Sequence, residues 1–295
     1  MPAKVLVVGS IAFDIIFSIE HDFRQSIPVE DGEIRNFNAV FMANEKTEYP
    51  GGTAGNIAWW LGQKGVSSSV FSAVGQDFDG KGYRQRLIER GAETRGEVGQ
   101  HSAHAYMISD PLHQQIIIWQ PNAYLANKTQ SLSEHYSQAE LQSFEIAVFA
   151  AGTPDSIRKH LEEFRAINNT ATVIFDPGQI THIFDAEGFK QCSKLADIIV
   201  GNNIEFTYFR EFGLPDDITQ IQTFGADGIE VIEKCEAERI PAVTAEKVVE
   251  TTGAGDAFRA GLISGLVQKL PLTEAAQLGA QLGAECVALP SGQGE

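Results

Sequence analysis

Residues 251–258 (TTGAGDAF) place small residues and one carboxylate directly before an apolar run with helical spacing. Apolar side chains recur after this segment at intervals of three and four, which predicts a helix. The first amides of a helix have no partner inside it, and Gly253, Ala254 and Gly255 would leave them open to an anion. Asp256 has one interpretation as a capping residue. The other is a general base that takes a proton from a substrate hydroxyl while the amides hold a phosphoryl group.

A second glycine-rich segment and a second carboxylate are candidates for holding an acceptor molecule. Residues 51–56 (GGTAGN) precede the apolar run IAWWL, and a tight turn and a ligand site are equally good interpretations of them. Asp14 follows Ser10 and the strand-like residues 4–9 (KVLVVG). In an open α/β sheet a carboxylate at this end of a strand faces the ligand crevice, and its two oxygens suit a vicinal diol. In most proteins an aspartate in this position would only form a turn.

Three other segments have ordinary explanations beside functional ones. Residues 75–82 (GQDFDGKG) approach a Walker A loop, but Gly82 has no hydroxyl for magnesium and two aspartates would repel phosphate, so we reject that interpretation. Residues 202–205 (NNIE) are either a helix cap or an oxygen-only pair suited to magnesium. Residues 223–228 (TFGADG) are by themselves a weak signal for a glycine turn.

Together these segments resemble the signature elements of the ribokinase/PfkB superfamily of carbohydrate and nucleoside kinases. Residues 251–258 resemble its most specific signature, and 51–56 its Gly-Gly-x-x-x-Asn element. Residues 202–205 and 223–228 resemble its Asn-x-x-Glu and Thr-x-Gly-x-x-Gly elements. Residues 74–80 match its Val-Gly-x-Asp-x-x-Gly element, which is mainly a structural turn. The elements occur in the order and spacing of the superfamily, so we identify the chain as a member.

The resemblance implies a role for each matching residue. Asp256 is the expected base, beside an anion hole made by Gly253, Ala254 and Gly255. The acceptor sugar is expected to contact Ser10, Asp14, Gly51, Gly52 and Asn56. ATP is expected to lie against Asn202, Thr223, Gly225, Gly228 and Thr252. Magnesium is expected near Asn202 and Glu205.

Three features concern the choice of acceptor. Residues 176–179 (DPGQ) resemble the Asp-Pro-x-Gln of bacterial adenosine kinases and archaeal nucleoside kinases, whereas sugar kinases commonly end this element with asparagine. The sequence GDAFRAG around Asp256 resembles the same nucleoside kinases, although Arg259 has a simpler explanation as a helix-surface partner at i+3. Trp119 would stack on adenine or belong to the core. We therefore expect ATP-dependent phosphorylation of the adenosine 5′-hydroxyl to AMP, with Trp119 and Gln179 on the base side.

Two other functions are compatible with these motifs. One is a sugar kinase or a broad nucleoside kinase of the same fold, and the other is a non-catalytic nucleoside sensor. The intact Gly-Ala-Gly-Asp argues against a sensor, which needs no base. Glu250 stands where the superfamily often has aspartate near a monovalent cation, so potassium dependence stays open. Relatives carry a final helix beyond the loop that 291–295 resembles.

The length of 295 residues allows one large α/β domain with an appendage or two small domains, and the resemblance implies a single ribokinase-like kinase domain over residues 1–295. No apolar run approaches the roughly 18 residues that span a membrane. The net charge of −17 argues against a nucleic-acid surface, and magnesium and helix amides would have to attract ATP. The three cysteines are far apart, which suits thiols in a reducing cytosol. The strand-like start carries no basic leader, so we expect a cytoplasmic protein.

Alternating strand and helix patterns predict an α/β fold with a central, mostly parallel sheet flanked by helices. Strand patterns occur at 4–9, 146–151, 172–176, 197–201 and 228–232, and helical patterns at 55–64, 80–90, 155–167 and 205–211.

Three further segments, 14–20, 34–49 and 103–119, alternate apolar and polar residues. This pattern predicts antiparallel strands with one wet face, and hence a small β-sheet lid. Open sheet edges tend to be paired, and in bacterial relatives two lids clasp each other. We therefore expect a homodimer through the lid.

Overall fold

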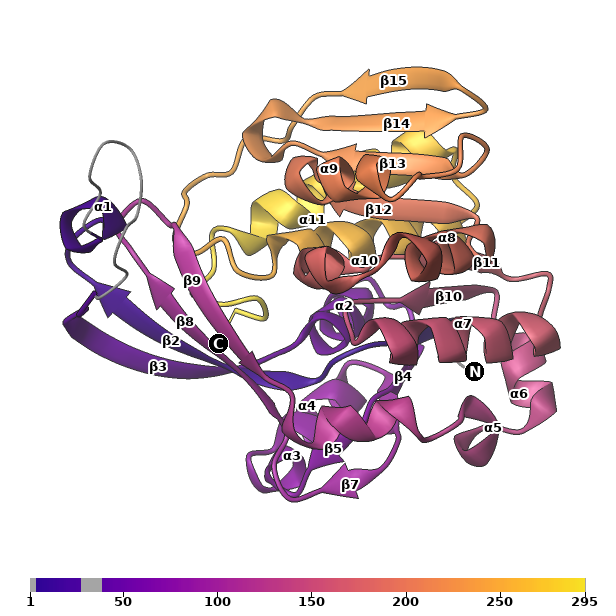
Figure 1. Cartoon of the computed structure of the whole chain (residues 1–295), viewed down its shortest axis with the longest axis horizontal. Coiled ribbons are helices and arrows are strands. Elements are labelled where there is room, and N and C mark those ends of the chain that lie inside the picture. The colour runs from indigo at the N-terminus through magenta and orange to yellow at the C-terminus, as the bar shows by residue number, and fades with distance from the viewer. Residues whose placement is uncertain (1–3, 28–38, 295) are drawn as a thin grey trace.

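The computed structural model describes residues 4–27 and 39–294. A large sheet forms the body, built from β1 (Val5–Val8), β4 (Ser68–Phe71), β6 (Ala92–Arg95), β10 (Ile146–Phe149), β11 (Thr172–Phe175), β12 (Ile198–Asn202), β13 (Thr219–Thr223), β14 (Ile229–Glu233) and β15 (Glu236–Ile240) (Figure 1). Its order is β15-β14-β13-β12-β11-β10-β1-β4-β6. The strands from β13 to β6 pair in parallel, and β14 and β15 extend the sheet in antiparallel fashion. The predicted central sheet is confirmed.

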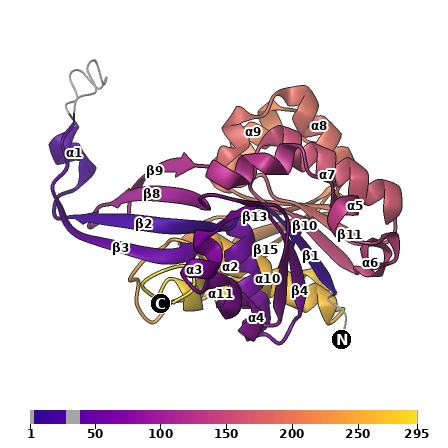
Figure 2. The same cartoon turned by 90° about the horizontal axis from the view of Figure 1, so that it is seen from below.

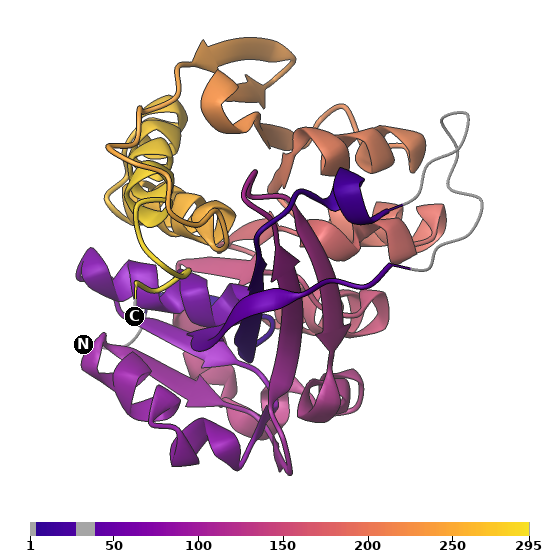
Figure 3. The same ribbon diagram turned by 90° about the vertical axis from the view of Figure 1, so that its left-hand side faces the viewer.

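Helices cover both faces of this sheet, as its uniformly apolar strands require. One face packs against α2 (Thr53–Gln63), α4 (Tyr83–Glu89), α10 (Ala254–Val267) and α11 (Leu272–Cys286). The other packs against α5 (Leu132–His135), α6 (Gln138–Ser143), α7 (Pro154–Ile167), α8 (Ala186–Lys194) and α9 (Asn203–Glu211). The two helix layers lie on opposite sides of the sheet in Figure 3. Strands buried on both faces read as continuous apolar runs, which is why VLVV was recognisable as β1.

A small sheet projects from the body, as Figure 2 shows. It contains β2 (Ala12–Ile19), β3 (Ala43–Gly51), β8 (Ala103–Ser109) and β9 (Gln115–Gln120) in the order β3-β2-β8-β9. The predicted segment 34–49 lies partly outside the described residues, and its strand runs later, to Gly51. The segment 103–119 contains the antiparallel strands β8 and β9 of a hairpin.

The prediction that all lid strands are antiparallel is wrong for one pair. β2 and β8 run parallel, with Asp14 opposite Ala105. Both strands run away from the body of the protein, and they come from segments far apart in the sequence. Their pairing is therefore parallel. An alternating pattern reports a half-buried strand but carries no information on the direction of its partner.

The residues 74–82 form a structural turn, as predicted. The short strand β5 (Val74–Gly75) pairs with β7 (Val98–Gly99), and α3 (Asp77–Gly80) follows. Asp77 accepts hydrogen bonds from the backbone and the hydroxyl of Ser102, both at 2.8 Å. The remaining short elements are α1 (Phe23–Ser26) and the 3₁₀ helices η1 (Asn122–Lys128), η2 (Gly178–Ile183) and η3 (Gly225–Asp227). Among the described helices, none has the length and apolar character to cross a bilayer.

Candidate active site

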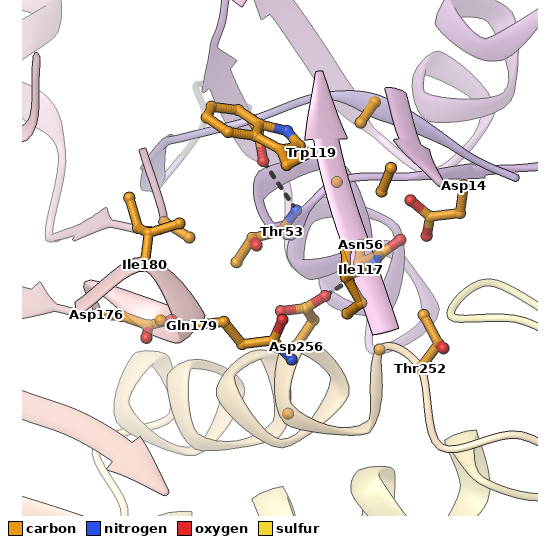
Figure 4. A pocket seen from close by; sticks show the side chains of 18 of the residues that line it. Asp14, Thr53, Asn56, Ile117, Trp119, Asp176, Gln179, Ile180, Thr252 and Asp256 are labelled. Atoms are coloured by element: carbon orange, nitrogen blue, oxygen red, sulfur yellow. Dashed lines mark hydrogen bonds between the residues drawn. The ribbon is translucent and has the colours of Figure 1, made fainter. Parts of the chain in front are cut away.

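A cavity of about 440 Å³ lies where the carboxyl ends of the parallel strands meet the lid. This is the edge at which open α/β sheets bind ligands. The end of β1, the ends of β11 to β13 and the start of α10 form its floor, and the lid forms the wall above them (Figure 4). Most of the residues predicted from the sequence line this one cavity, as described below.

The start of α10 places two of the three residues predicted for the anion hole, Gly253 and Gly255, at the cavity. Gly253 is the N-cap residue, with φ of +81°, a conformation that favours glycine. A side chain there is also excluded by space, because its Cβ would stand 2.5 Å from the Cα of Gly292. Gly253 and Gly255 line the cavity. The amide of Ala254 instead donates to the Thr251 carbonyl oxygen at 3.2 Å.

Asp256 lies in the first turn of α10 and faces the cavity. Its Oδ2 accepts a hydrogen bond of 2.8 Å from Nδ2 of Asn56. Burial raises the pKa of Asp256 to about 7, while the charge of Arg259 and the bond from Asn56 act in the opposite direction. A carboxyl with a pKa close to the working pH is well matched to general base catalysis.

Arg259 is not the surface partner of Asp256 that the sequence suggested. It is 8% exposed and donates from Nη2 to Oδ1 of Asp176 at 2.7 Å, while its Nε pairs with Oδ2 of the same carboxylate. Asp176 has no exposed surface, and a buried carboxylate needs a charged partner more than an exposed one does. Among the described residues that line the cavity, Arg259 is the only lysine or arginine.

Asp14 lies on β2 at the base of the lid and is 6% exposed. Burial raises its pKa to about 7, and the charges of Asp256 and Glu250 add to this effect. Gly51 makes room for it, since a Cβ on that residue would stand 2.1 Å from Oδ2 of Asp14. Gly52 lines the cavity as the N-cap of α2, with φ of +81°.

Ser10 and Asn56 both have partners inside the protein. The hydroxyl of Ser10 accepts from the Thr53 amide at 3.3 Å, which fixes the start of α2. Asn56 is 2% exposed and lies between Asp256 and Gln293, whose Nε2 donates to its Oδ1 at 3.0 Å. Sequence reasoning missed Gln293, because one glutamine in a glycine-rich loop gives no recognisable signal.

The lid contributes an apolar wall. Ala105, Met107, Ile117 and Trp119 line the cavity, and the indole of Trp119 packs edge-on against Tyr124 with ring centroids 5.4 Å apart. Gln179 and Ile180 of η2 lie across the cavity from this wall in Figure 4. Trp119 therefore packs at the base of the lid and also borders the cavity.

One lid contact was not anticipated. Nε2 of Gln115 on β9 donates to Oε1 of Glu250 at 2.9 Å and to Oγ1 of Thr252 at 2.7 Å. The same Oε1 accepts from the backbone amides of Thr251 and Thr252 at 2.7 and 3.1 Å. Glu250 therefore organises the loop before α10 and connects it to the lid.

The residues predicted to bind ATP do not all line the cavity. Asn202, Thr223, Gly225 and Thr252 line the cavity. Gly228 does not line the cavity but forms part of the turn below it. Its φ is +96°, and a Cβ there would stand 2.4 Å from the Ile240 carbonyl oxygen. Its requirement for glycine is therefore explained by backbone packing.

Asn202 and Glu205 form a reciprocal helix cap at the start of α9. Oδ1 of Asn202 accepts from the amides of Ile204 and Glu205, both at 2.9 Å, and Oε2 of Glu205 accepts from the Asn202 amide at 2.8 Å. No group of three or more His, Cys, Asp or Glu side chains in the described part of the chain is arranged to hold a metal. Because Oδ1 of Asn202 is used by two amides, the predicted pair is reduced to Glu205, whose other carboxylate oxygen suits magnesium held through a water.

The parallel sheet, the lid and the helix start with its carboxylate define a phosphotransferase of the ribokinase type. Residues 4–294 match the family described as pfkB family carbohydrate kinase, and the chain belongs to this family. It is therefore an enzyme that transfers a phosphoryl group to an alcohol acceptor.

Several relatives of this chain are nucleoside kinases. The Burkholderia thailandensis nucleoside kinase in complex with inosine is 28% identical, with a TM-score of 0.86 over 98% of this chain and 92% of its own. The Methanocaldococcus jannaschii nucleoside kinase is 26% identical over 289 residues, which are 94% of this chain and 88% of that protein. Adenosine kinase from Sinorhizobium meliloti has a TM-score of 0.81 at 18% identity, over 99% of this chain and 96% of its own, which shows a shared fold.

Proposed function

We propose that this protein is an ATP-dependent nucleoside kinase that phosphorylates the 5′-hydroxyl of adenosine to give AMP, a reaction of purine salvage. The observation that carries the proposal is that one cavity has a polar side and an apolar side. Asp14 and Asp256 lie on its polar side, and Trp119, Ile117 and Ile180 form apolar surfaces suited to a base. The relative from Burkholderia thailandensis, whose structures contain inosine or ADP and inosine, supports a purine nucleoside acceptor.

In the proposed reaction Asp256 removes the proton of the 5′-hydroxyl as its oxygen attacks the γ-phosphorus in line. The new P–O bond forms while the bond to the bridging oxygen breaks, and ADP leaves with the electron pair. The amides at Gly253 and Gly255 stabilise the charge on the transferred group, and Arg259 supplies a nearby cation. Asp14 accepts hydrogen bonds from the ribose 2′- and 3′-hydroxyls, which positions the 5′-oxygen.

The lid would exclude water from the cavity, which limits hydrolysis of ATP. Magnesium, when bound with ATP, would supply positive charge to the phosphates. Glu205 is the residue suited to hold it through a water molecule, while Asn202 keeps the helix start in place with its capping oxygen. Oε1 of Glu250 is engaged by four donors, so this oxygen is not available to a potassium ion.

The test is an ATP-consumption assay of the purified protein with adenosine, inosine, cytidine, ribose and fructose side by side. We expect the highest kcat/KM with adenosine, and ATP consumption lowered by at least about 10²-fold in the Asp256→Asn variant. A preference for ribose or fructose would identify a sugar kinase of the same fold. Nucleoside binding without turnover would identify a sensor instead.

We also propose that the protein forms a homodimer through its lid and works in the cytoplasm. Ile118 of β9 is 63% exposed and points away from the cavity, because the flanking residues Ile117 and Trp119 point into it. Within residues 4–27 and 39–294, neither outer strand of the lid, β3 or β9, has a further strand paired to its outer edge. Light scattering of a micromolar solution should report a dimer that Ile118→Glu dissociates, and a wild-type monomer would contradict the proposal. Cys192, Cys235 and Cys286 are unpaired, as suits a reducing compartment.

A further inference from the structure

The loop that follows α11 reaches back to the catalytic end of α2 and α10. Nε1 of Trp60 donates to the Gly292 carbonyl oxygen at 2.7 Å, which holds this loop against α2. Gly292 permits the approach, since a Cβ there would stand 2.9 Å from Nδ2 of Asn56. The next residue, Gln293, is 1% exposed and has its side-chain amide next to Asn56.

A continuous set of hydrogen bonds runs from Gln293 to Asp256. Nε2 of Gln293 donates to Oδ1 of Asn56 at 3.0 Å, and Nδ2 of Asn56 donates to Oδ2 of Asp256 at 2.8 Å. On its other side, Oε1 of Gln293 accepts from Nε of Arg86 at 3.3 Å. Nε2 of Gln293 also donates to the hydroxyl of Tyr83 at 2.5 Å, and this hydroxyl donates to the Gly51 carbonyl oxygen at 2.9 Å.

Arg86 at one end and the Asp256 carboxylate at the other determine which amide atom of Gln293 and of Asn56 faces each partner. A guanidinium has only donors, so Arg86 requires the oxygen of the Gln293 amide to face it. The NH₂ group of Gln293 must then face Asn56 and Tyr83. This in turn requires Oδ1 of Asn56 to face Gln293, which leaves its NH₂ group for Asp256. A reversed Asn56 amide would place its oxygen against a carboxylate and its donors against those of Gln293.

We infer that Gln293 is a positioning residue that orients the Asn56 amide and thereby ties Oδ2 of Asp256, leaving Oδ1 to receive the proton of the acceptor hydroxyl. No hydrogen bond to Oδ1 of Asp256 occurs within the described residues, so this oxygen is available to a substrate. Gln293 itself touches neither substrate nor phosphate in this arrangement. The inference depends on the proposed function only for the use that is made of the Asp256 carboxylate.

Other charged groups also act on Asp256, and they must stay constant in a test. Arg259 on the same helix, Asp176 at the end of β11 and Glu205 on α9 act on its pKa through their charges. Asp14 from the lid interacts with it in the same way. Gln293 carries no charge, so replacing it with a side chain of similar length changes the orientation of Asn56 and none of these charges.

The test is to measure the pKa of Asp256 directly, from the pH dependence of its ¹³C carboxyl resonance, assigned by its loss in Asp256→Asn. In Gln293→Met, a change that nearly preserves volume, we expect the pKa to rise by at least about half a pH unit, a threefold tighter proton. Gln293→Glu should raise it further, because its carboxylate presents only acceptors to Asn56 and adds a negative charge.

Two controls separate this role from a loss of loop structure. Ser291→Ala removes a hydroxyl that accepts from the Gln293 and Gly294 amides, at 3.3 and 3.1 Å, without touching Asn56, and it should leave the pKa unchanged. In an Asn56→Ala background, Gln293→Met should cause no further shift, because the effect passes through Asn56.

An Asp256 pKa that is equal in wild type and both Gln293 variants would overturn the inference. An equal shift in Ser291→Ala, or a Gln293→Met shift that persists without Asn56, would overturn it as well. The acidic limb of kcat/KM should move with the measured pKa. Because the resonance is followed without substrate, a protein that lacks nucleoside kinase activity yet shows the shift would refute the proposed function and leave the role of Gln293 intact.

Discussion

The floor and the lid wall of the cavity differ in chemistry and in how they are held. On the floor Asp256 and Asp176 are bound to Asn56 and Arg259, so each charged group has a polar partner inside the protein. The wall opposite presents mainly apolar side chains, such as Trp119, from a small sheet. A fixed polar floor is suited to stabilise a transition state, whereas an apolar wall discriminates between ligands. Changes on the floor should therefore alter rate, and changes on the wall should alter affinity.

The largest effect is expected at Asp256. Asp256→Asn should lower kcat by at least about 10²-fold, the low end for loss of a general base, and leave nucleoside affinity largely unchanged. Steady-state kinetics and calorimetric binding would measure the two quantities. Asp155→Asn, which changes an exposed carboxylate on α7, is the matched control and should behave as wild type. Near-normal turnover in Asp256→Asn would remove this residue from the mechanism.

Asp14 belongs to neither group fully, because it lies on a lid strand but is a carboxylate like the residues of the floor. Replacing it tests whether a lid residue can hold the acceptor. Asp14→Ala should weaken adenosine binding at least tenfold and change the KM for ATP much less, since a hydrogen bond to a charged group contributes about 1.5–3 kcal/mol. The wild type should also use 2′-deoxyadenosine poorly. Equal kcat/KM values for adenosine and deoxyadenosine would show that the ribose is held in another way.

Trp119 tests the wall itself. Trp119→Ala should reduce adenosine affinity by about 5- to 150-fold, because stacking on an aromatic side chain contributes about 1–3 kcal/mol per base. Trp119→Phe should retain most of the affinity, and kcat at saturation should change little in either variant. Titration calorimetry would provide the measurement. An adenosine affinity that is the same in Trp119→Ala would place the base elsewhere in the cavity.

The smallest effect concerns stability and pH. The pKa values of Asp14 and Asp256 are about 7 in the folded protein and 3.8 for an unperturbed aspartate, as in the unfolded chain. Between pH 3.8 and 7 the folded protein therefore binds more protons than the unfolded chain does. The contribution of these groups to stability is therefore full below pH 4 and lost as the pH rises to 7. The melting temperature of the wild type should fall between pH 5 and pH 8. In Asp14→Asn this fall should be smaller by a few degrees. Trp119→Ala should keep the wild-type pH dependence.

The local elements were predictable because burial imposes a pattern on neighbouring residues. Runs such as VLVV mark strands covered on both faces, and the small residues before Asp256 mark an open helix start. Several strands of the body, including β4 and β13, were not predicted. Their sequences SSVF and TQIQT contain polar residues, such as Ser69 and Gln222, whose side chains hydrogen-bond within the fold, so they lack the apolar run that identified β1.

The sequence alone determined the family, the central sheet and the residues that surround the cavity, because these depend on short motifs whose members are close in the chain. Only the tertiary structure decided which residue each side chain meets. Asn56 contacts residues 200 and 237 positions away, and the partner of Arg259 is 83 positions away. Contacts at such separations leave no periodicity in the sequence. They follow from the packing of α2, α10 and the last loop against one another.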